Sequence, residues 1–224
     1  MDNIMIHRRV FMTDIYIADA AQVDMRQELS ADDAAEADKY KNEGARRLFI
    51  AGRLLLYRAV KERTGSNAAV IKKGPFGKPR IEGDPFFFNI SHSGHYAMLV
   101  CDPLREAGCD IEQIRGNTRG IARRFFSDGE YKKILRAWDF DDEFCRMWTK
   151  KESYIKARGG GLSIPLDSFA ISRDMGGRYR VSEKGAPVLC AIADIDTGIA
   201  GYHAAVCLMG AGDITGRISF ICLH

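Results

Sequence analysis

The chain has 224 residues, of which 46% are hydrophobic and 28% are charged, and its net charge at pH 7 is +3. These proportions are typical of a globular protein, and no apolar stretch is long enough to cross a bilayer, so we expect no membrane-spanning segment. Acids and arginines interrupt the apolar run at the amino terminus, which argues against a signal peptide. The six cysteines lack the spacing of a zinc site, so we expect reduced, mostly buried thiols and a cytoplasmic location.

The positive charge is concentrated in one region. Between Lys39 and Arg80, twelve Lys and Arg residues stand against only Glu43 and Glu62, a local balance of +10, so the rest of the chain sums to −7. Such an asymmetry indicates a polyanionic partner: nucleic acid, a nucleotide with several phosphates, or an acidic protein. A well-solvated basic surface is the alternative.

The first half of the sequence alternates strands and helices. A strand is predicted from Arg9 to Ala18, followed by an acidic, helical segment through Lys41. The segment from Ala45 to Glu62 is predicted as a helix because its apolar residues share one face. The arginines of this helix flank that face, Arg46 and Arg53 on one rim and Arg47 and Arg58 on the other.

A cationic connection and two short strands should follow. Gly and Pro are too frequent between Lys72 and Arg80 for a regular element, which predicts a loop or hairpin. Strands are predicted from Phe86 to Asn89 and from Tyr96 to Cys101, around a turn from Ser91 to Gly94.

The second half repeats this theme loosely. Its predicted elements are a strand from Cys109 to Ile114, helices from Ile121 to Arg136 and from Asp142 to Arg158, and strands at Ser168 to Ser172, Arg178 to Val181 and Tyr202 to Met209. Two strands that begin with glycine, Gly94 to Cys101 and Gly201 to Cys207, can be aligned with each other. We therefore predict an α+β protein built from two similar α+β halves in one chain.

Three carboxylates indicate a metal site. Strand alternation sends Asp110 and Glu112 to the same face, where they repel each other unless a hard divalent cation such as magnesium lies between them. A solvated acidic edge is the alternative. Glu152 adds a third oxygen ligand if its helix packs over this strand. On that helix Glu152 shares a stripe with Trp148 and Lys156, and Lys151 lies on the adjacent stripe, which puts two cations beside the acid.

Five tracts in this order make the sequence resemble the Sfp-type 4'-phosphopantetheinyl transferase family. They are Gly77 to Pro79, Phe88 to Ser93, Gly108 to Glu112, Arg124 to Ser127 with Glu130, and Trp148 to Lys156 running on through Gly161 to Phe169. Together they extend over most of the chain, from about residue 45 to 209. The resemblance implies a pseudo-twofold fold with the active site between an amino-terminal half, 1–105, that binds the nucleotide end and a carboxy-terminal half, 106–224, that carries the metal and catalytic residues.

The resemblance also implies a reaction. A magnesium-dependent enzyme of this family is expected to transfer the 4'-phosphopantetheine group from coenzyme A to a serine of an apo acyl or peptidyl carrier protein, releasing adenosine 3',5'-bisphosphate. Coenzyme A and the carrier protein are then the partners, without nucleic acid or membrane. One chain contains both halves, so a monomer is expected to suffice.

Site residues follow from the same resemblance. Asp110, Glu112 and Glu152 are expected to hold magnesium against the pyrophosphate. Glu152 is also the candidate base for the serine proton, directly or through water, unless it is a ligand only, and Lys156 would neutralise the leaving oxygen. The expected coenzyme A contacts are Ser91, His92, Lys151 and Lys156 at the phosphates and Arg47, Arg53 and Lys78 at the nucleotide end, with Arg46 as an alternative to Arg47.

Two other functional classes remain open from the residues alone. A magnesium-dependent nuclease also uses clustered carboxylates, but the lysine common two residues after the second acid is replaced by Ile114. A non-catalytic module that binds coenzyme A or an acidic protein explains the basic region but does not require three converging acids. The sequence leaves the carrier undetermined among fatty-acid, polyketide, nonribosomal-peptide and siderophore carriers.

Overall fold

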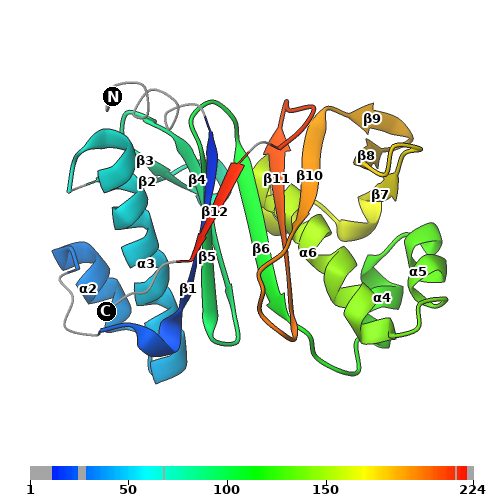
Figure 1. Ribbon diagram of the computed structural model, residues 1–224, viewed down its shortest axis with the longest axis horizontal. Helices are drawn as coiled ribbons and strands as arrows, with labels where there is room; N and C mark the ends of the chain where they lie inside the picture. The colour runs from blue at the N-terminus through cyan, green and yellow to red at the C-terminus, as the bar shows by residue number, and fades with distance from the viewer. Residues whose placement is uncertain (1–11, 25–28, 68, 215, 221–224) are drawn as a thin grey trace.

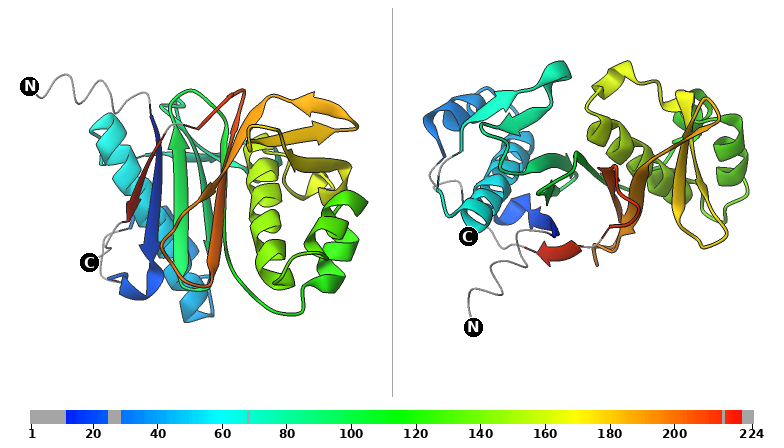
Figure 2. Two further views of the ribbon diagram at one scale, coloured as in Figure 1. Left: turned by 45° about the vertical axis from the view of Figure 1, so that its right-hand side comes forward. Right: turned by 90° about the horizontal axis from the view of Figure 1, so that it is seen from above.

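A computed structural model describes residues 12–24, 29–67, 69–214 and 216–220. Two sheets stand side by side in the middle of the molecule (Figure 1), and α3 (Glu43–Thr64) and α6 (Phe140–Arg158) lie on their outer flanks. Seen from above, the strands of both sheets lie between these two helices (Figure 2). The mixed architecture confirms the predicted α+β class. Within the described residues, no helix combines the length and apolar character needed to cross a membrane.

The first sheet has the strand order β12-β1-β5-β4. Its strands are β1 (Thr13–Asp19), β4 (Phe87–Ser93), β5 (Tyr96–Asp102) and β12 (Gly216–Phe220). Only β12, which pairs with β1, runs parallel to its neighbour. The remaining elements of this half are η1 (Ala20–Gln22), α2 (Ala31–Ala37) and a hairpin of β2 (Ile71–Lys73), η2 (Pro75–Gly77) and β3 (Pro79–Ile81).

The second sheet has the order β10-β11-β6 and is antiparallel throughout. Its strands are β6 (Ala107–Gln113), β10 (Cys190–Ile195) and β11 (Tyr202–Met209). Around it lie α4 (Arg119–Phe125), α5 (Asp128–Ile134), η3 (Gly161–Ser163), η4 (Leu166–Ser168) and a small sheet of β7 (Phe169–Arg173), β8 (Tyr179–Glu183) and β9 (Ala186–Val188).

Local sequence signals set the limits of the long helices. The Asn42 side chain caps the first turn of α3, and Gly65 ends it in the left-handed conformation that favours glycine. Asp139 and Gly159 do the same for α6. The apolar face of α3 then packs on β5, as the periodicity predicts.

An apolar layer joins the two sheets. Met98 and Val100 of β5 pack with Ile111 of β6 and Val206 of β11, and all four side chains are fully buried. The glycine-led strands of the sequence correspond to β5 and β11, which are the central strands of the trios β1-β5-β4 and β10-β11-β6. Strand β12, however, belongs to the first sheet, so residues 216–220 return to the amino-terminal half.

Several predicted elements need correction. The helix predicted from Ile121 to Arg136 is interrupted because Ser127 begins a new helix through a reciprocal capping box with Glu130. The turn predicted at Ser91 to Gly94 is wrong: β4 continues through Ser93, so Ser91 and His92 lie in a strand and the turn is at Gly94 and His95. Strands β9, β10 and β12 were not predicted.

Other predictions are confirmed. The cationic segment forms the β2–β3 hairpin. The helix predicted from Ala45 to Glu62 corresponds to α3, and the strand expected from Arg9 is present from Thr13 onward. Residues 9–11 of that strand and residues 25–28 of the acidic segment lie outside the described residues, and α2 is the helix in the remainder. The five described cysteines are free and buried, as expected, and Cys222 lies outside the described residues.

Candidate active site

Side chains, rather than a backbone ladder, join β4 to β6. The two strands belong to different sheets, yet every second residue of β4 reaches an alternate amide of β6. The acceptors are Asn89 Oδ1 for the Cys109 N–H (3.0 Å), Ser91 Oγ for Ile111 (3.4 Å) and Ser93 Oγ for Gln113 (3.2 Å). This regular joint explains the Asn-x-Ser-x-Ser spacing of the sequence.

The same hydroxyls also hold the carboxylates of β6. Ser91 Oγ donates a hydrogen bond to Asp110 Oδ1 at 2.8 Å, and Ser93 Oγ donates to Glu112 Oε2 at 2.6 Å. Both acids therefore lie on one face of β6, as strand alternation predicts. Sequence reasoning did not include Asn89 or Ser93 among the site residues, although their period-two spacing with Ser91 was a usable signal.

Gly108 lets α6 approach that face of β6. A Cβ atom at position 108 would lie 2.1 Å from the carbonyl oxygen of Ser153 and 2.3 Å from the amide nitrogen of Ala157, so only glycine fits. The helix consequently packs directly on the strand. This packing brings Glu152 and Lys156 over the carboxylates, which confirms the expected contact of the helix with the strand.

Asp110 is the most buried member of the cluster, with 2% of its surface exposed. Its Oδ1 atom accepts hydrogen bonds from Ser91 and from Lys156 Nζ, the latter at 2.6 Å. Its Oδ2 atom is buried and accepts no hydrogen bond from the described part of the chain. A buried carboxylate oxygen without a donor is costly, so this position favours a cation.

The three carboxylates share one electrostatic environment. Burial raises the pKa of Asp110, Glu112 and Glu152. For Glu152, the charges of Asp110 and Glu112 raise the pKa further, while Lys156 opposes this effect. Negative charge thus accumulates here beyond what one ammonium group balances.

Lys156 lies within this cluster and His92 at its edge. Lys156 Nζ also donates to Ser91 Oγ at 2.9 Å, and 28% of its side chain is exposed. Burial opposes the charge on Lys156, but the Asp110 carboxylate outweighs that effect and raises its pKa. Burial of the imidazole and then the Lys156 charge lower the pKa of His92. This burial is only partial, because a substantial part of the His92 surface is exposed on β4.

The chemistry of these residues fits a divalent cation, but their side chains are not arranged around one common point. In the described residues, no group of three or more His, Cys, Asp or Glu side chains is arranged to hold a metal ion. Lys156 instead contacts the oxygen of Asp110. The fit rests on the oxygen-only donors, the raised pKa values and the unpaired Oδ2 of Asp110.

Lys151 does not reach the cluster, contrary to expectation. Its side chain is fully buried, and Nζ donates to both oxygens of Glu130, at 2.8 and 2.9 Å, and to the Phe169 carbonyl at 2.8 Å. Lys150 is likewise buried and donates to Asp194 at 2.6 Å. These two lysines hold α6 to β10 and α5. Of the three lysines of α6, Lys156 is therefore the one that contacts a carboxylate of the cluster.

The expected nucleotide-end residues are also dispersed. Lys78 Nζ donates to Glu106 and to the carbonyls of Ala107 and Ala157, and only 9% of its side chain is exposed. Lys78 therefore ties β3 to β6 and the end of α6 instead of facing an open site. These contacts do not support its expected role at the nucleotide.

Arg47 and Arg53 both lie on α3 but contact different partners. Arg47 contacts Glu43 at 3.0 Å and the Val23 carbonyl at 3.4 Å. Arg53 lies 2.9 Å from Asp33 of α2 and lines a pocket of about 560 Å³ together with residues of α2 and the β2–β3 hairpin. The alternative residue Arg46 contacts Asp38 at 2.6 Å. Each arginine therefore already has a carboxylate that a phosphate would have to replace.

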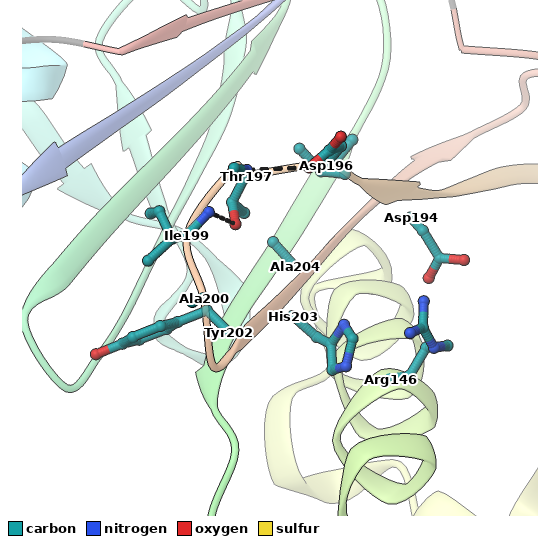
Figure 3. Close-up of a pocket in the computed structure, with 11 residues that line it drawn as sticks. Arg146, Asp194, Asp196, Thr197, Ile199, Ala200, Tyr202, His203 and Ala204 are labelled. Atoms are coloured by element: carbon teal, nitrogen blue, oxygen red, sulfur yellow. Dashed lines mark hydrogen bonds between the residues drawn. The ribbon is translucent and has the colours of Figure 1, made fainter. Parts of the chain in front are cut away.

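A second pocket lies away from the carboxylates. It measures about 590 Å³ and lies between α6 and the loop joining β10 to β11 (Figure 3). Arg146, Asp194 and His203 line one side of it, and Thr197 and Ile199 come from the loop. None of Asp110, Glu112 and Glu152 lines this pocket.

Comparisons with known proteins match most of the chain to one family. Residues 18–104 match the family described as 4'-phosphopantetheinyl transferase, N-terminal, and residues 106–207 match the 4'-phosphopantetheinyl transferase superfamily. The 4'-phosphopantetheinyl transferase ffp of Bacillus subtilis is 38% identical over 177 residues, covering 75% of this chain and 76% of that protein. Another B. subtilis 4'-phosphopantetheinyl transferase is 38% identical over 174 residues, with the same two coverages. Among solved structures, the holo-[acyl-carrier-protein] synthase of Thermotoga maritima has a TM-score of 0.41 at 14% identity, covering 48% of this chain and 66% of that one.

Proposed function

The chain belongs to the 4'-phosphopantetheinyl transferase family, and we propose that the cluster around Asp110 is its active site. The chain transfers the 4'-phosphopantetheine group from coenzyme A to a serine hydroxyl of an apo carrier protein. The observation that supports this site best is the buried, unpaired Oδ2 of Asp110 among three carboxylates and one ammonium group. The active site then lies where residues 1–105 supply Ser91 and His92 and residues 106–224 supply the three carboxylates and Lys156.

Asp110, Glu112 and Glu152 would hold magnesium. The oxygen donors, their raised pKa values and the unpaired oxygen support this assignment. When bound, the ion supplies positive charge that stabilises the pyrophosphate of coenzyme A during transfer. Ser91 and Ser93 orient two of the carboxylates through hydrogen bonds that leave other carboxylate oxygens available.

The residues of the chain then handle the proton and the leaving group. The serine oxygen of the carrier forms a bond to the pyrophosphate phosphorus next to pantetheine, and the bond from that phosphorus to the oxygen of adenosine 3',5'-bisphosphate breaks. Glu152 accepts the serine proton, directly or through water, because it is a carboxylate of the cluster that a positioned serine could reach. Lys156 neutralises the departing oxygen, and His92 contacts the phosphates.

We propose that Arg47 and Arg53 bind the nucleotide end of coenzyme A. Lys78 is left out of that set and Lys151 is left out of the phosphate contacts, because both are buried in structural ion pairs. Arg53→Ala should then raise KM for coenzyme A more than KM for 3'-dephospho-coenzyme A, since only the first carries the phosphate that the arginine binds. Equal changes for both substrates would remove Arg53 from the nucleotide site. Arg53 must give up its ion pair with Asp33 to bind the phosphate, so the two changes in KM should differ by only about fivefold, or about 1 kcal/mol.

One chain contributes every proposed residue, so we propose that a monomer suffices. We also propose that the enzyme acts in the cytoplasm, because the five described cysteines are free and buried. A panel of purified apo carrier proteins, each incubated with the chain, coenzyme A and magnesium, tests the function. The expected result is a mass increase by one phosphopantetheine on at least one carrier, with equimolar release of adenosine 3',5'-bisphosphate. Each carrier with its serine replaced by alanine is the control. Full turnover in chelator, after verified removal of metal, would contradict the magnesium assignment while leaving the transfer intact.

A further inference from the structure

The turn between β4 and β5 is held by a tyrosine of the other sheet. Tyr202, the first residue of β11, has its hydroxyl oxygen 3.1 Å from the His95 N–H, which donates to it. Its ring packs edge-on against Tyr96, with ring centroids 5.0 Å apart and planes at 82°. Figure 3 shows Tyr202 and His203 pointing to opposite sides of β11, and both residues line the pocket beside the β10–β11 loop.

Gly94 makes this contact possible. A Cβ atom at position 94 would overlap the Tyr202 hydroxyl and lie 2.8 Å from Gln113 Oε1. The glycine also has φ +58°, a conformation that other residues adopt at a cost. The turn therefore fits a notch formed by Tyr202 of β11 and Gln113 of β6.

This notch lies at the end of the β4–β6 joint. Ser93, which precedes Gly94, holds both the Gln113 amide and the Glu112 carboxylate. Tyr202 pairs with Gln113 in the sheet, so the residue that receives the turn is fixed to the strand that carries the carboxylates. A shift of the turn along Tyr202 would move Ser93 and Ser91 relative to Glu112 and Asp110, because no backbone ladder joins β4 to β6 in the described residues.

We propose that Tyr202 is a positioning residue for transfer: with Gly94 it fixes the register of β4 on β6, and thereby the placement of the serine hydroxyls on the two carboxylates. The inference rests on the proposed function of that cluster. It concerns how the cluster is aligned and adds no group that touches substrate. Small misplacements of groups in an active site lower kcat strongly, so the contact matters for rate more than for binding.

Tyr202→Phe removes the hydroxyl and keeps the ring. We expect kcat to fall about threefold to tenfold, the effect of about 1 kcal/mol, while KM for coenzyme A changes less than twofold. Hydrogen exchange should increase in peptides covering residues 87–93 and 107–113 and stay unchanged in β10. Gly94→Ala should lower kcat more than Tyr202→Phe, and the double variant should lose less than the product of the two single losses, because removal of the hydroxyl relieves part of the overlap.

Tyr179→Phe is the matched control. It removes a hydroxyl bond of 2.6 Å to Asp194 in the second half, away from the joint, and should lower Tm without lowering kcat. A wild-type kcat and wild-type exchange in Tyr202→Phe would overturn the proposal, as would strictly multiplicative effects with Gly94→Ala. Exchange is measured without substrate or metal, so an altered exchange with an inactive wild-type protein would instead count against the proposed function.

Discussion

Two lysine–carboxylate pairs of α6 differ in how completely their charges are matched. Lys151 and Glu130 are both buried, and Glu130 also accepts hydrogen bonds from the Ser127 hydroxyl and the Ile171 amide. Lys156 and Asp110 are joined as closely, yet Asp110 keeps one buried oxygen without a donor. Five residues along one helix thus separate a satisfied pair from an unsatisfied one.

The difference distinguishes structural from functional charge. A buried ion pair stabilises a fold only when hydrogen bonds compensate the lost hydration of both ions, and the Glu130 pair meets this condition. The Asp110 cluster does not, because it collects three carboxylates whose pKa values are raised by burial. Such an uncompensated cluster is expected where a ligand supplies the missing charge. Variants of the two pairs should therefore affect different properties.

The largest effect is expected from Asp110→Asn. This change keeps the size of the side chain and an acceptor for Ser91, but removes the charge that would hold magnesium. We expect the transfer rate to fall by at least about a thousandfold, as for loss of a major electrostatic contributor, with a native circular-dichroism spectrum. Asp194→Asn, which removes the carboxylate that accepts from Lys150, is the control and should retain the wild-type rate per folded molecule. A rate within tenfold of wild type for Asp110→Asn would move the metal site elsewhere.

Lys151→Met should do the reverse. It leaves the Glu130 charge buried without its cation, so the free energy of unfolding should fall by about 3 to 5 kcal/mol, as measured by urea denaturation. The protein that remains folded should transfer phosphopantetheine at the wild-type rate, because Lys151 lies outside the cluster. A normal stability with a reduced rate would return Lys151 to the phosphates.

Glu152→Gln tests whether the third carboxylate is a base as well as a ligand. We expect kcat to fall by about a hundredfold or more, with weaker loss of coenzyme A binding, because the amide cannot accept the serine proton. The wild-type pH profile of kcat should have an acidic limb, caused by protonation of the base, that the variant lacks. Equal loss of binding and turnover, restored together by higher magnesium, would identify a ligand only.

The contrast between the two pairs also shows what sequence can predict. Strand alternation correctly paired Asp110 with Glu112, because the side-chain period of a strand is fixed by backbone geometry. Helical spacing also placed Lys151 next to Glu152 on the surface of the helix. Spacing alone, however, could not show which neighbouring element each of these side chains would contact. That choice was made by Glu130, which the capping box at Ser127 holds 21 residues earlier in the chain.

The same reasoning explains Lys78 and the central joint. Lys78 belongs to a basic stretch, and composition alone could not reveal that it would donate to Glu106 and to carbonyls of two distant segments. Asn89 was predicted to end a strand, and Ser91 to Gly94 were predicted as a turn because Ser and Gly favour turns. Its polar side chains instead replace a backbone ladder between sheets, an arrangement that depends on tertiary packing.

The smallest effect is expected from Glu112→Gln on stability without metal. The pKa of Glu112 is raised in the folded protein, mainly by burial, so the folded protein binds more protons than the unfolded protein above the ordinary value of 4.5. Stability therefore falls as pH rises through that window, and the loss is complete above the folded pKa. Glutamine keeps an acceptor for Ser93 and removes this loss. In chelator the variant should be more stable than wild type at pH 7, and the gain should vanish as the pH falls below the ordinary pKa of a glutamate.

Glu183→Gln supplies the opposite sign. A hydrogen bond from Tyr154 lowers the pKa of Glu183, so this carboxylate stabilises the fold when charged, and its variant should be less stable at pH 7. Urea denaturation of both variants at pH 4 and pH 7, with chelator and with magnesium, measures the comparison. Magnesium should stabilise the wild type more than Glu112→Gln, because only the wild type has the full set of three charges to neutralise. If Glu112→Gln is less stable than wild type at pH 7 in chelator, the cluster is electrostatically satisfied without metal, and the distinction between the two pairs fails.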